Sequence, residues 1–335
     1  MNPFKKNNEI IPEASINSVY IDDVLASNLF RPSILINEIK NNAALLEIDP
    51  SSDDSIIFQD FNKRLNSENK IVYDKANDIA MQFGDKLASV FLTLKKPSDL
   101  SIKNRLNWSQ VHWDYWKSIK KIILVGGLTS PILTNIFLKR INLLLRNNEV
   151  TDLKVSFVKG SSDFGTKGLI NLFDEGEYLL FDFGQTHIKR RYNIKVDSVS
   201  VIDMVLPKIK SKFLFYKEKN NEEIRDLAYR LDMYIIDVIL QTINDVDFNG
   251  SNIIIGIANY ISKGKIYSAR GGYGKLAYVD DNYQSYLSNV ISNKLNRKID
   301  ILLYHDTSSM ALNFKSEKDC AVVSLGTAFG IAFPE

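Results

Sequence analysis

The stretch LLFDFGQTHIK, residues 179–189, guides the interpretation of the whole chain. Apolar residues surround Asp182, which indicates a carboxylate near the end of a buried strand. A buried, ionised carboxylate is costly unless it is paired or binds a metal ion. Gly184 permits close approach to the backbone, and Thr186 adds a hydroxyl at the turn. Strand, acid, glycine and hydroxyl in this order predict a phosphate and Mg²⁺ site on a tight hairpin.

Length and composition restrict the class of protein. The chain has 335 residues, of which 45% are hydrophobic and 24% charged, as expected for a soluble protein of about two domains. The net charge of +2 gives no support for a nucleic-acid partner, although it does not exclude single-stranded binding. The one cysteine, Cys320, excludes an internal disulfide framework and a thiolate zinc site. With no signal-peptide pattern and no apolar run near the ~18–20 residues that span a bilayer, we expect a cytoplasmic protein without a membrane partner.

The order of predicted strands and helices in the second half of the chain indicates a mixed sheet. Three strands in a row are followed by alternating helices and strands, with one more strand at the end. Three antiparallel strands that lead into alternating helix and strand are typical of an RNase H-like sheet. The predicted strands are 178–183, 188–196, 199–206, 252–258, 299–304 and 321–325, and the predicted helices are 222–243 and 283–295.

The first half is mainly helical. Residues 20–100 show helical spacing of apolar residues, and a basic pair followed by Pro97 ends the last helix. Strands are predicted at 121–125 and 154–158, with a helix over 128–145 between them. The polar segment 97–119 carries three tryptophans, for which a buried or dimer-facing aromatic cluster is favoured over a ligand pocket.

Four predicted strands end in residues suited to binding or catalysis, and strand ends are where ligand sites form in α/β sheets. Each has a plainer alternative. Asp306 is either a general base for a hydroxyl or the N-cap of the next helix. The glycine-containing turns either face phosphate or a flat ring, or are simple turns. The four segments are Asp182-x-Gly184-x-Thr186, His305-Asp306, Gly326-Thr327 and Gly126-Gly127.

These segments resemble the phosphate-1, catalytic-Asp, phosphate-2 and adenosine motifs of the sugar kinase/actin-like ATPase superfamily, with the ROK and hexokinase-type carbohydrate kinases most similar. FDFGQTHIK is similar to D-x-G-G-T-x-x-K, YHDTSSMAL to N-D-x-x-A-A-x, and VVSLGTAFGIAF to the L-G-T-G-x-G-x-G hairpin. ILVGGLTSPILTNIFLKRINLLL resembles the adenosine motif, IIIGIANYISKGKI the segment that lines the sugar pocket, and FVKGSSDFGTKGLINL the closing helix of the family.

The order of these motifs differs from that of the family, in which phosphate-1 comes first and the adenosine motif near the end. The resemblance therefore implies a circular permutation of two RNase H-like (actin-like ATPase) domains, α/β with mixed sheets flanked by helices and a cleft between them. Residues 1–175 plus 316–335 would form the nucleotide-binding domain, and residues 176–315 the phosphate-1 and acceptor-binding domain.

The resemblance also implies a role for each matching residue. Asp182 would hold Mg²⁺ and Asp306 would activate the acceptor hydroxyl. The remaining assignments fall into three groups: Gly184, Gln185, Thr186, Gly326 and Thr327 near the phosphates of ATP; Gly126, Gly127 and Leu128 around its adenosine; and Asn259, His305 and Lys189 near the acceptor.

The chain departs from the family at several points. Gln185 stands in place of the second glycine of the phosphate-1 motif, and Asn259-Tyr260 replaces a Pro-Gly turn that lines the sugar pocket. The Cys-rich zinc motif and an E-x-x-G-H motif are absent. The basic run 189–191 either meets an anionic acceptor or forms a solvated strand edge. Gly271–Gly274 is either a substrate loop or a flexible turn.

The function implied is an ATP- and Mg²⁺-dependent kinase that phosphorylates a hydroxyl of a sugar, sugar acid or related small polyhydroxy compound. A non-catalytic nucleotide-binding regulator and an actin-like ATPase are the alternatives. A homodimer is suggested by family analogy alone.

Overall fold

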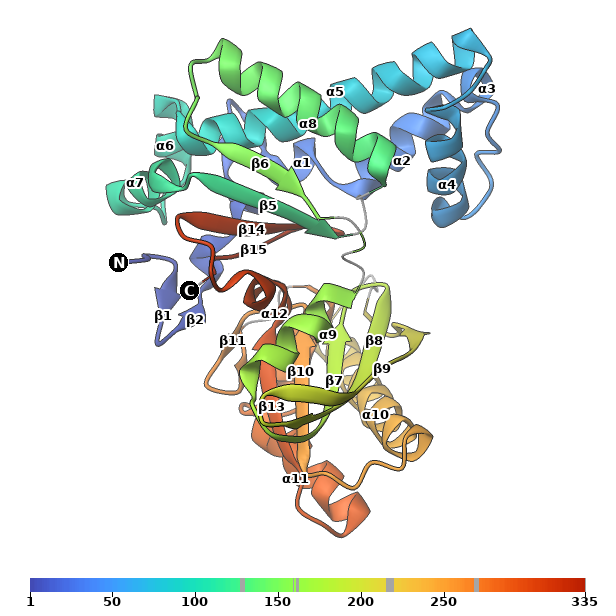
Figure 1. Ribbon diagram of the computed structural model, residues 1–335, viewed down its shortest axis with the longest axis vertical. Coiled ribbons are helices and arrows are strands. Elements are labelled where there is room, and N and C mark those ends of the chain that lie inside the picture. The colour runs from blue at the N-terminus through green and yellow to red at the C-terminus, as the bar shows by residue number, and fades with distance from the viewer. Residues whose placement is uncertain (127–129, 159, 161–162, 215–219, 268–270, 335) are drawn as a thin grey trace. The chain divides into compact units, whose positions relative to one another are not determined.

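The computed structural model describes the chain outside residues 127–129, 159, 161–162, 215–219, 268–270 and 335 (Figure 1). Two compact units are present. Unit 1 comprises residues 1–4, 13–162 and 317–333, and unit 2 comprises residues 5–12, 163–316 and 334–335. Each unit is described by itself.

Unit 2 is built on a five-stranded mixed sheet. Its strand order is β13-β10-β7-β8-β9, in which β10 and β13 run parallel to β7 whereas β8 runs antiparallel to both of its neighbours. The predicted RNase H-like topology is therefore confirmed. The strands are β7 (Gly176–Phe183), β8 (His187–Val196), β9 (Val199–Lys210), β10 (Asn252–Ile257) and β13 (Asp300–His305).

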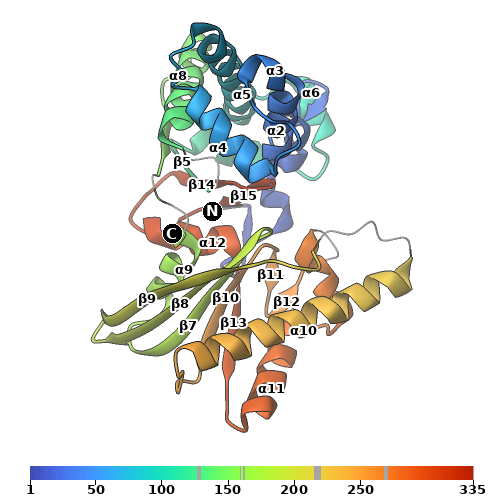
Figure 2. The same cartoon turned by 90° about the vertical axis from the view of Figure 1, so that its right-hand side faces the viewer.

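Helices cover both faces of this sheet because consecutive residues of its central strands are apolar and point to opposite faces (Figure 2). Leu180 and Ile254 pack with Leu169 of α9 on one face. Phe181 and Ile255 belong to a larger cluster with α10 and α11 on the other. The helices are α9 (Phe164–Leu169), α10 (Asn221–Asp245), α11 (Tyr283–Leu295) and α12 (Asp306–Ala311), and short elements are β1 (Lys5–Lys6), β2 (Glu9–Ile10), β11 (Ile261–Ser262), β12 (Lys265–Ile266) and the 3₁₀ helix η5 (Gly272–Tyr278).

Unit 1 has a four-stranded sheet assembled from distant parts of the chain. Its order is β15-β14-β5-β6, with β14, β5 and β6 parallel and β15 antiparallel at the edge. The central pair joins a strand from late in the sequence to one about 200 residues earlier, because Cys320 pairs with Lys121. The strands are β5 (Lys121–Gly126), β6 (Lys154–Phe157), β14 (Cys320–Leu325) and β15 (Phe329–Ala332).

The predicted helical region of unit 1 is confirmed. Long helices α5 and α8 pack against each other, and Phe30, Phe83 and Phe137 form a mutually contacting aromatic group among them. The elements are β3 (Tyr20–Ile21), β4 (Val24–Leu25), α1 (Ala26–Leu29), α2 (Pro32–Asn41), α3 (Ala43–Leu46), α4 (Asp54–Arg64), α5 (Lys70–Lys95), α6 (Asp99–Asn104), α7 (Gln110–Ser118) and α8 (Pro131–Asn147).

The segment 97–119 forms two short helices, and its tryptophans are buried core residues. Phe4 lies among them, 5.2 Å from Trp108 between ring centroids, and stacks on Phe333 at 5.5 Å. Residues from both ends of the chain thus share one aromatic cluster.

The two units divide the chain near the expected domain boundaries but not at them. Residues 163–175, which the sequence analysis assigned to the first domain, lie in unit 2. The reason is α9, which packs against α12 and β7. Among the described residues, no helix is both long and apolar enough to cross a bilayer.

Candidate active site

The carboxyl ends of three parallel strands of unit 2 finish at the same level. Ile257 of β10 pairs with Phe183 of β7 on one side and with His305 of β13 on the other. The segments that follow these strands carry most of the residues singled out from the sequence. The topology therefore gathers Asp182, Asn259 and Asp306 at one edge of one sheet.

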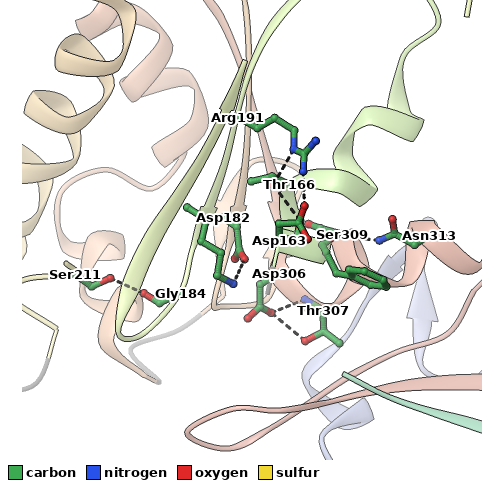
Figure 3. A network of polar contacts seen from close by, with 12 residues as sticks. Asp163, Thr166, Asp182, Gly184, Arg191, Ser211, Asp306, Thr307, Ser309 and Asn313 are labelled. Atoms are coloured by element: carbon green, nitrogen blue, oxygen red, sulfur yellow. Dashed lines mark hydrogen bonds and ion pairs between the residues drawn. The ribbon is translucent and has the colours of Figure 1, made fainter. Parts of the chain in front are cut away.

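Asp182 is buried, with 2% of its side chain exposed, and it is paired. Its Oδ2 lies 2.7 Å from Nζ of Lys189, the residue directly opposite on β8. The predicted burial of this carboxylate is confirmed, and its charge is balanced by an ammonium group (Figure 3).

The basic run 189–191 is not a solvated strand edge, because β9 covers β8 on its outer side. Arg190 and Arg191 each have 4% of the side chain exposed. Arg190 donates to Asp245, and Arg191 donates to Asp163 and Asp203. These two arginines stabilise the fold, which leaves Lys189 as the basic residue of the run beside Asp182.

Gly165 of α9 provides a second contact to Asp182. A Cβ added at this glycine would lie 2.5 Å from Oδ2 of Asp182, so no other residue fits without displacing the carboxylate. No role for Gly165 follows from the sequence pattern of this segment. The available signal was the presence of two glycines, Gly165 and Gly168, three residues apart. Gly168 is also tightly packed, against Ser309 of α12.

Asp306 is the first residue of α12, and it is not the helix cap. The side chain of His305 accepts from the N–H of Ser308 and takes the N-cap position. The N-cap alternative for Asp306 is therefore wrong. Oδ1 of Asp306 accepts from the N–H of Thr307 at 2.6 Å and from its hydroxyl at 3.2 Å. Among the described residues, no hydrogen bond or ion pair engages Oδ2 (Figure 3).

Burial, followed by the negative charge of Asp182, raises the pKa of Asp306 to about 7. About 21% of the Asp306 side chain is exposed, so the carboxyl group remains reachable from solvent. A carboxyl group that titrates near neutral pH is suited to general acid–base chemistry.

His305 lies beside this carboxyl group as a neutral imidazole. Burial lowers the pKa of His305 to about 3. Because Nδ1 accepts from the N–H of Ser308, the ring hydrogen is on Nε2, which lies 3.4 Å from Oδ1 of Asp306. Tyr260 stacks on the His305 ring at 4.9 Å, and the neighbouring Asn259 is buried. His305, one of the three predicted acceptor residues, thus lies next to the predicted base.

The hairpin between β7 and β8 is held from both sides. The carbonyl of Gly184 accepts from the hydroxyls of Ser211 and Tyr273. Gln185 turns its side chain toward Gly272, and its buried Oε1 has no hydrogen-bond partner in the part of the chain that the structure describes. Thr186 is exposed at the turn. The segment Gly272–Tyr273 therefore packs on the hairpin as part of η5, where the sequence left a substrate loop or a flexible turn open.

The remaining predicted residues belong to unit 1. Gly126 has φ +113°, and a Cβ there would lie 2.9 Å from the carbonyl oxygen of Leu325. The packing of β5 against β14 thus accounts for this glycine without a ligand. Gly326 and Thr327 are exposed in the turn between β14 and β15. Gly127 and Leu128 lie outside the described residues.

The acidic residues of unit 2 fit Mg²⁺ in the way that phosphate-bound magnesium requires. Among the described residues, no group of three or more His, Cys, Asp or Glu side chains could enclose a metal ion. Mg²⁺ does not need such a cage, because one or two carboxylates, water and substrate phosphates usually complete its coordination. Asp182 and Asp306 are carboxylates of the kind that such a site uses, and the negative charge of Asp182 already raises the pKa of Asp306.

Comparisons with known proteins give little further definition. No family model and no curated protein matches the chain. An exopolyphosphatase-like protein of known structure is 11% identical, with a TM-score of 0.31 over 72% of this chain and 82% of that one. The Ppx/GppA phosphatase of Aquifex aeolicus, type II variant, is 10% identical, with a TM-score of 0.32 over 76% and 87% of the two chains. At these scores the similarities carry no argument, and the RNase H-like fold of unit 2 rests on its own sheet topology.

Proposed function

We propose that this protein catalyses Mg²⁺-dependent phosphoryl transfer from a nucleoside triphosphate, with Asp182 as the metal carboxylate and Asp306 as the general base. The observation that carries the proposal is the pair of carboxyl groups at one sheet edge, one ion-paired and one with a pKa of about 7. Phosphoryl transfer depends mainly on positioning and charge neutralisation, which this edge is built to supply.

Each residue has a defined task in this proposal. When bound, Mg²⁺ neutralises charge on the phosphates. The ammonium of Lys189, 30% exposed, is near enough to Asp182 to exchange that partner for a phosphate oxygen. Oδ2 of Asp306 takes the proton from the attacking oxygen, while Thr307 holds Oδ1. The Gly326-Thr327 turn of unit 1 is proposed to bind phosphate through its exposed backbone.

Water is the attacking group that requires the fewest further residues. The first candidate is therefore ATP hydrolysis by an actin-like ATPase. Asp306 is partly exposed, so solvent reaches the proposed base. The Pro-Gly turn and the E-x-x-G-H motif, which would have indicated a hexose pocket, are missing from the sequence.

A small-molecule kinase is the second candidate. It is favoured by His305, which lies beside the base, and by Tyr260, which stacks on the His305 ring. These groups could orient an acceptor hydroxyl, and the expected acceptors remain sugars, sugar acids and polyols.

One experiment separates these candidates. ATP consumption is measured with Mg²⁺ or EDTA, first alone and then with a panel of sugars, sugar acids, polyols and nucleosides. Phosphate release without any acceptor supports hydrolysis, and stimulation by one class with a phosphorylated product supports a kinase. ATP binding without turnover under all conditions would contradict both and favour a regulatory nucleotide-binding protein.

A further inference from the structure

Strand β9 forms one margin of the unit 2 sheet (Figure 2). It spans Val199–Lys210 and pairs only with β8, so its outer backbone groups have no strand partner within the described chain. Long edge strands of this kind template pairing with a further strand. The opposite margin, β13, has half the length, with six residues against twelve.

The side chains of β9 are unusually apolar for an exposed strand. Edge strands are normally protected by charges or prolines. Here Pro207, Lys208 and Lys210 protect the last part, whereas the first part has one charge, Asp203, which is paired with Arg191. The first part carries five exposed apolar side chains: Val199 (63% exposed), Val201 (59%), Ile202 (39%), Met204 (43%) and Val205 (57%).

The geometry of β9 defines which part can pair. Its register with β8 is regular from Ile202 to Leu206 and shifts beyond each end. Because bulges end regular pairing, the segment free to accept a further strand is Ile202–Leu206. Met204 is at its centre.

We propose that β9 pairs antiparallel with β9 of a second copy of this chain, about a two-fold axis at Met204. An isologous pair of this kind places Ile202 opposite Leu206 and Met204 opposite itself, all on one face. On the other face Asp203 lies opposite Val205, and its charge is already neutralised by Arg191.

Charge also favours this occupant. In the same register, Lys208 and Lys210 lie opposite Ser200 and Ser198 of the other copy, so no like charges face each other. The strand is therefore complementary to itself in both apolar pattern and charge, and pairing removes the exposed edge of both copies.

The size of the contact predicts its strength. The surface area that a pair of five-residue strands buries is smaller than the ~1,200 Å² of a standard stable interface. We therefore expect a dimer that dissociates on dilution rather than a permanent one.

Sedimentation of the full chain at several concentrations tests the proposal. The wild type is expected to dimerise as its concentration rises. Met204→Lys places two lysines opposite each other and is expected to weaken dimerisation by about tenfold or more. Leu302→Lys on β13, where Leu302 is 41% exposed, is the matched control and should dimerise like the wild type.

A cross-link tests the register without relying on a destabilised variant. Opposite Cα atoms in antiparallel strands lie about 4.5–5.5 Å apart, within disulfide range. Met204→Cys is expected to form a covalent dimer on mild oxidation, and Leu302→Cys is not, while Cys320 is 3% exposed and out of reach. A wild type that stays monomeric at all concentrations overturns the proposal, as does a dimer that neither Met204→Lys weakens nor Met204→Cys cross-links.

Discussion

Asp306 carries the main prediction at the level of single residues. Asp306→Asn removes the proposed base but keeps the hydrogen-bonding shape of the side chain, so phosphoryl transfer should fall about 10²–10⁴-fold. Binding of a fluorescent ATP analogue should be unchanged. Asp300→Asn, which changes an exposed acid at the start of the preceding strand β13, is the control and should keep full activity. Full activity in Asp306→Asn would refute the assignment of the base.

The same carboxyl group predicts a pH dependence of activity. Its pKa is raised to about 7, and a general base must be ionised to accept a proton. The rate should therefore fall below neutral pH. Measuring the rate from acid to mildly alkaline pH checks this. The wild type should lose activity on the acidic side, and any residual activity of Asp306→Asn should not show this loss.

Stability should also depend on pH through Asp306. In the unfolded chain an aspartate titrates near 3.9, whereas the folded chain keeps this proton up to about pH 7. The folded state thus binds more protons between these values, and stability falls as pH rises through that window. Without Mg²⁺, Asp306→Asn should be more stable than the wild type at pH 8, by on the order of 1–3 kcal/mol, and equally stable near pH 4. Urea unfolding at both pH values tests this, and the same difference at both would contradict it.

The ion pair of Asp182 gives a test of the metal assignment. Lys189→Met leaves a buried carboxylate unpaired and should cost about 1–3 kcal/mol of folding stability, since the lysine itself is partly exposed. Because a cation can replace the lost ammonium, Mg²⁺ should stabilise this variant more than the wild type. Thermal unfolding with and without Mg²⁺ measures the difference. The double variant with Asp182→Asn should lose the response.

Sequence reasoning identified both acidic residues but not their partners. Asp182 and Asp306 were visible because each follows an apolar run. The Lys189 contact was not, since it depends on the register of β8 against β7. Gly165 was also missed. Its role depends on how its helix α9 packs against β7, and the sequence pattern does not show this packing.

At the level of elements, the contact between α9 and α12 is tight enough to test. A Cβ at Gly168 would lie 1.7 Å from the carbonyl oxygen of Ser309, whereas one at Gly84 in α5 would meet the Arg140 side chain at 3.2 Å. Gly168→Ala must move backbone and should destabilise the protein by roughly 2–4 kcal/mol. Gly84→Ala requires its side-chain neighbours to shift only slightly and gains helix propensity, so its effect should be below about 1 kcal/mol. Equal effects in urea unfolding would contradict this account.

The elements themselves were largely predictable. The helix 283–295 and the central strands were recognised because continuous apolar runs and helical spacing mark them directly. The third strand was expected to end at Leu206, but it continues to Lys210. Residues 207–210 were not expected in the strand, because the side-chain pattern alone does not show that β8 offers backbone partners there.

At the level of the whole molecule, the aromatic cluster predicts that the chain tolerates circular permutation. Phe4 and Phe333 stack within unit 1, so a short linker that joins the segments beyond these two residues has little distance to span. A chain that begins at Asp163 and ends at residue 162 should fold with an unfolding midpoint within a few degrees of the original. Circular dichroism measures this, and a chain that starts within β7 serves as the disrupted control.

The domain boundary was the least predictable feature at this scale. Motif order placed it near residue 176, where the first strand of unit 2 begins. The unit begins at residue 163 because two glycines allow α9 to press against Asp182 and Ser309. A domain boundary that is set by close helix packing cannot be recognised from a change in amino-acid composition.

The divided sheet of unit 1 also determines when that unit can form during synthesis. Its central strand β14 is made after residues 163–316 of unit 2, although most of unit 1 has emerged from the ribosome long before. The segment 163–316 can complete its own sheet while β5 still lacks its inner neighbour. The part translated first is therefore the last to mature, and its helices must wait for the final strands. A chaperone that binds the emerging chain should remain on unit 1 until β14 is released.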